Sequence, residues 1–150
     1  MNRIRKKSLS ELDLSTITQI TLSAEDEKQF EKGIALFNAE KFWEAHEAWE
    51  EIWMRHPEDG RFFIQGLIQL AAGYHQLRRK IYRGFVIHLR RAQERFVLFP
   101  GNFLGVNVRD LLSAIDSSLS AINAKENSDE AESPRMIFPE IERSSKQRRG

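Results

Sequence analysis

The sequence contains no cysteine. That absence excludes disulfide bonds, thiolate ligands for a metal ion and a cysteine nucleophile, and it fits a reducing compartment. The sequence also lacks any run approaching the roughly 20 apolar residues that a membrane-spanning helix requires. The basic residues near the start are not followed by a continuous apolar segment, so we expect no secretory signal. We therefore expect a soluble, cytoplasmic protein with no membrane partner.

Two common catalytic devices are missing as well. The eight glycines form no phosphate-binding loop, and the serines lie mainly in the terminal segments and the last predicted helix, so no nucleophile stands out. What is present is typical of a globular chain: 150 residues, 41% hydrophobic and 30% charged. A chain of this length buries roughly 68–70% of its unfolded surface, which is enough for one core.

Apolar residues recur at helical spacing in five segments. Ser23, followed by acidic residues, is a suitable cap for the first helix. The second helix ends before His56-Pro57, because the residue before a proline is pushed out of helical geometry. Pro100-Gly101-Asn102 stops the fourth helix. The predicted helices cover residues 23–38, 41–55, 61–80, 83–99 and 108–124.

The third predicted helix is apolar over most of its circumference, so it belongs in the middle of the domain. Its one sizeable polar stripe consists of Gln65, Gln69 and Gln76. Gly66 and Gly73 share a face and would let another helix approach closely. The sequence thus predicts an all-α fold, a compact antiparallel bundle of about five helices. We expect an N-terminal arm over 1–22, the bundle over 23–124 and a flexible tail over 125–150, with a short docking segment at 136–138 as an alternative.

The second predicted helix places polar residues beside aromatic ones. His46 and Glu50 are four residues apart, hence neighbours on the helix surface, and they lie between Trp53 and Trp43 around the helix. Polar groups that point toward a core need partners, because an unpaired one costs about 1–3 kcal/mol. Their partners would be each other, the glutamine stripe, His75, a buried water or a ligand.

Two motifs carry a resemblance to a known family. The runs FNAEKFWEAHEAWEEIW and FFIQGLIQLAAGYHQL resemble the bacterial and plastid family called domain of unknown function 309, over about residues 30 to 110. The resemblance implies a compact all-α fold and brings no established activity. This chain departs from the family mainly in its longer terminal segments. The family's recurrent positions correspond to Glu44, His46, Glu47, Trp49, Glu50, Trp53, Gln65, Gly66 and Gln69.

The best candidate site is a polar cluster from the second and third helices. Imidazole and carboxylate groups four residues apart are sensible ligands for a divalent metal, so His46 and Glu50 are the candidate metal ligands. His46-Glu47 begins like the HExxH helix of zinc proteases, but Glu50 stands where the second histidine would be, and we reject that reading. The alternative is a hydrogen-bonded pair that fixes helix packing. The candidate ligand or polar cluster is His46, Glu47, Glu50, Gln65, Gln69 and His75.

Charge is distributed unevenly although the net charge is only +1. The stretch 78–95 holds seven basic residues against Glu94, and the stretch 40–51 holds five glutamates against Lys41. A polyanion would bind through Arg90, Arg91 and Arg95. The two stretches can instead pair with each other. No recognised nucleic-acid motif is present, so we do not expect a nucleic-acid partner.

The function predicted from the sequence is that of an uncharacterised helical bundle, a binding or scaffolding domain more than an enzyme. A metal or small-ligand site on the second helix is the alternative, and polyanion binding through residues 78–95 is the second alternative. A divalent metal is the only cofactor that the residues suggest. A protein partner or a homo-oligomer is left open.

Overall fold

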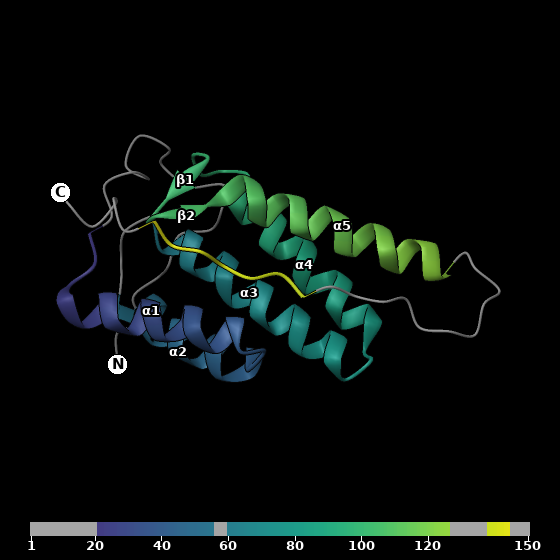
Figure 1. Ribbon diagram of the computed structural model, residues 1–150, viewed down its shortest axis with the longest axis horizontal. Helices are drawn as coiled ribbons and strands as arrows, with labels where there is room; N and C mark the ends of the chain where they lie inside the picture. The colour runs from purple at the N-terminus through teal and green to yellow at the C-terminus, as the bar shows by residue number, and fades with distance from the viewer. Residues whose placement is uncertain (1–20, 56–59, 127–137, 145–150) are drawn as a thin grey trace, which may run out of the picture.

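The computed structural model describes residues 21–55, 60–126 and 138–144 (Figure 1). The all-α prediction is confirmed, because five helices make up most of this part of the chain. A two-stranded hairpin lies between the fourth and fifth helices. None of these helices has the length and apolar character needed to cross a membrane. The helices are α1 (Ala24–Asn38), α2 (Phe42–Arg55), α3 (Arg61–Arg78), α4 (Tyr82–Phe96) and α5 (Val108–Glu126); the strands are β1 (Asn102–Phe103) and β2 (Val106–Asn107).

The helix boundaries follow from local chemistry. Ser23 caps α1 as predicted, because its side chain accepts a hydrogen bond from the backbone of Asp26. The turns after α1 and α3 are closed by Glu40 and Lys80, which have left-handed backbones with φ of 61° and 59°. In each turn the next residue donates back to a carbonyl five residues earlier, a Schellman closure. These tight turns hold α1 against α2 and α3 against α4 in antiparallel pairs. His56 and Pro57 lie outside the described residues.

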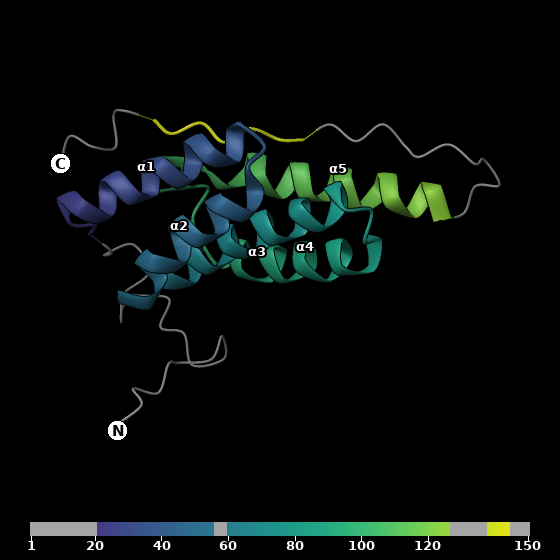
Figure 2. The same ribbon diagram turned by 90° about the horizontal axis from the view of Figure 1, so that it is seen from below.

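The elements form two layers (Figure 2). Helices α2, α3 and α4 lie side by side, with α3 in the middle, and α1, α5 and residues 138–144 cover one face of that row. α3 supplies the centre of the core, with side chains that are completely buried. The hydroxyls of Tyr74 on α3 and Ser118 on α5 are 2.7 Å apart, and burial raises the pKa of Tyr74 to about 12. The fully buried large side chains of α3 are Phe63, Ile64, Leu67, Leu70 and Tyr74.

The predicted close approach at the glycines of α3 is present. A methyl group at Gly66 would lie 2.7 Å from the ring of Phe96, and one at Gly73 would lie 2.5 Å from Leu89. Both contacts are with α4, so the two helices pack closely along this seam.

The hairpin was expected only as a loop. Its strands pair Asn102 with Asn107 and Phe103 with Val106. The turn residues Leu104 and Gly105 both have positive φ, 52° and 77°, which is the pattern of a type I′ turn.

The described C-terminal residues, 138–144, lie in the seam between α1 and α5 (Figure 1). Asn38 on α1 forms two hydrogen bonds with the backbone of Ile141, of 2.8 and 2.7 Å. The ring of Phe138 packs on Phe42 and Tyr74, with centroids 5.4 and 5.9 Å away. We predicted a flexible tail here, with a docking segment as the alternative; residues 138–144 are docked on the bundle.

Arg143 joins this segment to α1 and to the hairpin. Its guanidinium binds Glu27 through both terminal nitrogens at 2.6 and 3.0 Å, and Glu31 at 2.9 Å. Its Nε donates to the carbonyl of Leu104, and the group lies over the ring of Phe30. Burial lowers the pKa of Arg143, but the hydrogen bonds to Glu27 and Glu31 outweigh it, so the pKa is raised. The side chain is only 5% exposed.

We predict that Arg143→Met lowers the free energy of unfolding by about 2–4 kcal/mol, because it leaves two carboxylates and a carbonyl without their donor. Urea unfolding followed by circular dichroism measures this. Arg109→Met, at an exposed position, is the matched control and should change stability by less than about 0.5 kcal/mol. An equal effect of the two variants would contradict the role given to Arg143.

Candidate functional site

A polar strip runs along the face of α3 that points away from α1 and α5. We define this strip by the predicted glutamine stripe and by the α2 and α4 side chains that border it. No described element covers it (Figure 2). Its members on α3 are Gln65, Gln69 and Gln76; on α2 they are Trp43, His46 and Glu50; on α4 they are His88 and Arg95.

The α4 side of the strip is closed by hydrogen bonds. Nδ1 of His88 lies 2.7 Å from the amide oxygen of Gln69, so Nδ1 carries the proton and donates. Nε of Arg95 donates to the amide oxygen of Gln65, also at 2.7 Å. Burial, then the charges of Arg91 and His46, lowers the pKa of His88. On this side the polar groups satisfy one another and fix α4 against α3.

The α2 side is different. Nε2 of His46 lies 3.4 Å from a carboxylate oxygen of Glu50, and the imidazole stacks on the indole of Trp43 with centroids 4.6 Å apart. Nδ1 of His46 is buried and has no hydrogen-bond partner within the described residues. The ring of Trp43 also contacts His75 at 5.2 Å. Burial, then the charge of Arg79, lowers the pKa of His75.

Residues 30–88 match the model of the family described as Domain of unknown function (DUF309). Over those residues, the chain is similar to this family. The resemblance predicted from the two motifs is thereby confirmed, and no curated protein matches the chain. The DUF309 segment runs from Phe30 on α1 to His88 on α4. It therefore contains most of the polar strip and ends before Arg95.

The predicted cluster is only partly assembled in the DUF309 segment. His46 lies beside Glu50 and is linked to His75 through Trp43. Gln65 and Gln69 hydrogen-bond to α4 instead, and Glu47 is exposed. Trp43, His88 and Arg95 were not predicted as members of this cluster. His88 and Arg95 are seven residues apart on one face of α4, so both can face the glutamine stripe of α3, and this shared face was the available signal.

For a metal ion, the described residues offer no group of three or more His, Asp or Glu side chains placed to hold it. His46 and Glu50 are thus a pair of possible ligands without a third from those residue types in that part of the chain.

For a polyanion, the three predicted arginines are not equivalent. Arg90 and Arg91 are exposed. The side chain of Arg95 is 15% exposed and hydrogen-bonds to Gln65 and to the carbonyl of Arg91. Burial lowers the pKa of Arg95. Arg95 is thus occupied in holding α4 to α3.

Among the surface pockets in the described part of the chain are three of similar size. One, of about 520 Å³, adjoins the polar strip where Trp43 meets His75. A second, of about 550 Å³, lies between α4 and α5 and is lined by Arg83, Arg90, Asn123 and apolar side chains. The first is lined by Ala39, Glu40, Lys41, Phe42, Trp43, Glu44, His75, Arg78 and Arg79.

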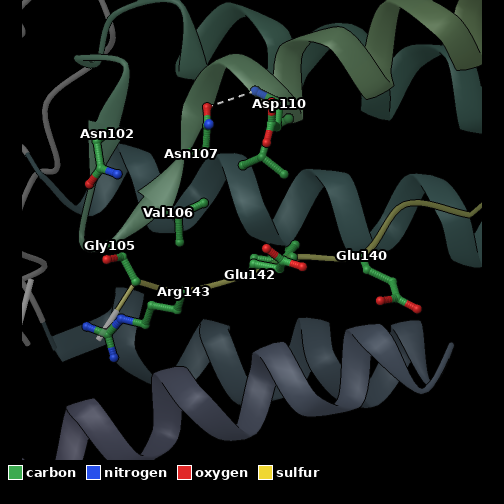
Figure 3. A pocket seen from close by; sticks show the side chains of 11 residues that line it. Asn102, Gly105, Val106, Asn107, Asp110, Glu140, Glu142 and Arg143 are labelled. Atoms are coloured by element: carbon green, nitrogen blue, oxygen red, sulfur yellow. Dashed lines mark hydrogen bonds between the residues drawn. The ribbon is translucent and has the colours of Figure 1, made fainter. Parts of the chain in front are cut away.

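The third pocket, of about 490 Å³, lies where the hairpin, the start of α5 and residues 140–144 meet (Figure 3). The side chain of Asn107 accepts a hydrogen bond from the backbone of Asp110, which caps α5. The guanidinium of Arg143 lies apart from Asp110 and Glu140, as Figure 3 shows. This pocket is the junction of the docked C-terminal residues, whereas the pocket beside Trp43 contacts the polar strip.

We predict that His46→Phe leaves the free energy of unfolding unchanged or raises it by up to about 1 kcal/mol. The phenyl ring keeps the stack on Trp43 and removes a buried nitrogen that lacks a partner. If His46 instead serves packing as a hydrogen-bonded pair, the loss should be about 1–3 kcal/mol. Chemical denaturation distinguishes these results, with Gln69→Ala, which removes the partner of His88, as a control that should lose about 1 kcal/mol.

A second prediction concerns pH. The folded-state pKa values of His75 and His88 both lie below 6.5, so their neutral forms stabilise the fold above that pH. That contribution is lost as the pH falls through the folded-state values. Between about pH 7 and about pH 5, the free energy of unfolding should therefore fall more steeply in the wild type than in His75→Gln/His88→Gln. Parallel slopes in urea titrations across this range would show that these histidines do not titrate as stated.

Proposed function

We propose that this chain is a cytoplasmic binding domain, not an enzyme, and that it takes a small anionic ligand in the pocket beside Trp43. The observation that carries the proposal is Trp43 itself. Its side chain is 46% exposed, yet the ring is held between two histidines at the edge of a pocket of about 520 Å³. A large aromatic ring that is fixed in place and still exposed is typical of recognition surfaces.

The pocket lining has a net positive charge, since Lys41, Arg78 and Arg79 outnumber Glu40 and Glu44, and this favours an anion. Arg78 is paired with Glu40 at 3.1 Å. Lys41 and Arg79 form no ion pair within the described residues, and both line the pocket. His75 and Arg79 both line this pocket, and the charge of Arg79 contributes to the lowered pKa of His75. A bound anion would be attracted to Arg79 and would favour protonation of His75.

His46 contributes in a second way. Its stack fixes the indole of Trp43, and its Nε2 faces Glu50. Metal binding at His46 and Glu50 is the alternative, and a separate titration tests it. Polyanion binding through Arg90, Arg91 and Arg95 is less favoured, because Arg95 is engaged with Gln65.

The test is a titration of nitrogen-15-labelled protein with inorganic phosphate, followed by NMR of the indole and imidazole side chains. We expect saturable shifts at Trp43 and His75 and a rise in the pKa of His75. Arg79→Ala should abolish both effects, and Arg109→Ala, an exposed arginine outside the pocket, should retain them.

A parallel titration with zinc chloride tests the metal alternative. Stoichiometric shifts at His46 that disappear in His46→Phe would replace the anion proposal with a metal site. The absence of any saturable phosphate effect on Trp43 or His75 would contradict the proposal.

A further inference from the structure

The pocket of about 550 Å³ between α4 and α5 is formed where one side of each helix faces the other. α4 and α5 are antiparallel, so the first turns of α4 lie beside the last turns of α5 (Figure 1). The lining residues of α4 recur at i, i+3, i+4 and i+7, which is the spacing of neighbours on one side of a helix. The pocket therefore follows the seam between the two helices. The α4 residues that line it are Arg83, Val86, Ile87 and Arg90.

The interior of this pocket is apolar. Ile122 is buried, and Val86 and Leu119 are half-buried. Ile87 lies at the rim and is 39% exposed. Clefts of about 300–1,000 Å³ that lie between the helices of a bundle, with mostly apolar walls and a few charged or polar groups, are typical small-molecule sites. A ligand that fills this pocket therefore needs an apolar part.

The charged part of the lining is entirely basic. The side chains of Arg83 and Arg90 form no ion pair or hydrogen bond with the described residues, and the remaining polar lining residue, Asn123, is uncharged. The pairing between the two charged stretches that we considered from the sequence is limited, in the part of the chain that the structure describes, to Arg78 with Glu40. The two arginines of the pocket are therefore left for an anionic group.

The seam is closed beyond Arg90. Gln93 on α4 donates a hydrogen bond of 2.9 Å to Asp116 on α5, and neither side chain lines the pocket. The pocket is therefore short and does not run the length of both helices. This shape suits a single-chain small molecule and does not suit a partner helix, which needs a continuous apolar groove.

Arg83 and Arg90 are two turns apart, about 10.5 Å along α4, and Ile87 lies between them. Both arginines are exposed, so their long side chains can turn toward one anionic group beside Ile87. A guanidinium binds a carboxylate through two parallel hydrogen bonds. We propose that the pocket between α4 and α5 binds a free fatty acid, with its hydrocarbon chain against the apolar lining and its carboxylate on Arg83 and Arg90.

A membrane surface also offers acyl chains and negative charge, but the pocket does not suit one. Helices that bind membranes insert protruding apolar side chains. Here the apolar side chains other than Ile87 are recessed between the two helices. A polyanion is disfavoured as well, since Arg91 lies outside the pocket and Arg95 binds Gln65 on α3. The observations therefore favour the monomeric acid.

This site is separate from the pocket beside Trp43, and the inference does not depend on the proposed function. No residue lines both pockets. The experiment is isothermal titration calorimetry of the full chain with sodium decanoate below its micelle concentration. We expect saturable one-to-one binding that strengthens by up to about fourfold for each CH₂ added between octanoate and dodecanoate. Acetate, which lacks the chain, and decyltrimethylammonium, which carries the opposite charge, should not bind measurably.

Arg83→Gln/Arg90→Gln should weaken decanoate binding at least about tenfold, because the carboxylate loses its charged donors. Arg91→Gln, at an exposed position outside the pocket, is the matched control and should bind like the wild type. Ile87→Glu should abolish binding, since its own carboxylate lies next to both arginines on the helix and takes the place of the ligand. Val97→Glu, at another exposed apolar position, should bind like the wild type. Circular dichroism checks that each variant is folded.

NMR of nitrogen-15-labelled protein then locates the bound acid. Shifts centred on residues 83–90 and 119–123, and retained in Arg79→Ala, would support this site even if phosphate does not bind beside Trp43. Shifts centred on Trp43 would place the acid in the other pocket and overturn the proposal. Binding to phosphatidylglycerol vesicles without binding of monomeric decanoate, equal binding of decyltrimethylammonium, or full affinity in Arg83→Gln/Arg90→Gln would overturn it as well.

Discussion

Most of the circumference of α3 has to be covered by the other elements, because most of its side chains are apolar and leaving them exposed would cost about 25 cal/mol per Å². α2 and α4 cover its two sides, and Gly66 and Gly73 let α4 approach closely enough to do so. α1, α5 and the C-terminal residues cover the inner face. What is left is one polar strip with nothing described above it. The candidate site therefore lies on the one face of α3 whose side chains are polar and need not be buried.

Much of this arrangement could be predicted from local patterns. The helical periodicity located the five helices, Ser23 marked the start of α1, and the glycine spacing on α3 predicted a close contact. The hairpin could not be predicted in the same way. Its strands have two residues each, and Val106 also pairs with Arg143, which is far along the chain. The closing residues Glu40 and Lys80 gave no signal either, because left-handed backbone usually attracts glycine or asparagine.

The candidate site illustrates a different limit. Periodicity placed Gln65 and Gln69 on one stripe but could not tell which neighbouring helix would supply their partners. Both α2 and α4 carry histidine and charged groups within reach, and the structure pairs the glutamines with His88 and Arg95. His46 therefore lacks the glutamine partner on α3 that was predicted as one possibility. The polar strip therefore has hydrogen bonds that fix the packing on its α4 side, whereas on its α2 side Nδ1 of His46 has no hydrogen-bond partner within the described residues.

The contacts of Arg143 also bear on the order of events during synthesis. The glutamates that it binds on α1 precede it by 116 and 112 residues. On a ribosome that adds about 5–20 residues per second, Arg143 is synthesised several seconds or more after the glutamates of α1. Until then the seam between α1 and α5 is open, with the rings of Phe42 and Tyr74 lacking the cover of Phe138. During that interval the uncovered rings are available for aggregation and for chaperone binding. The docking of residues 138–144 then covers them.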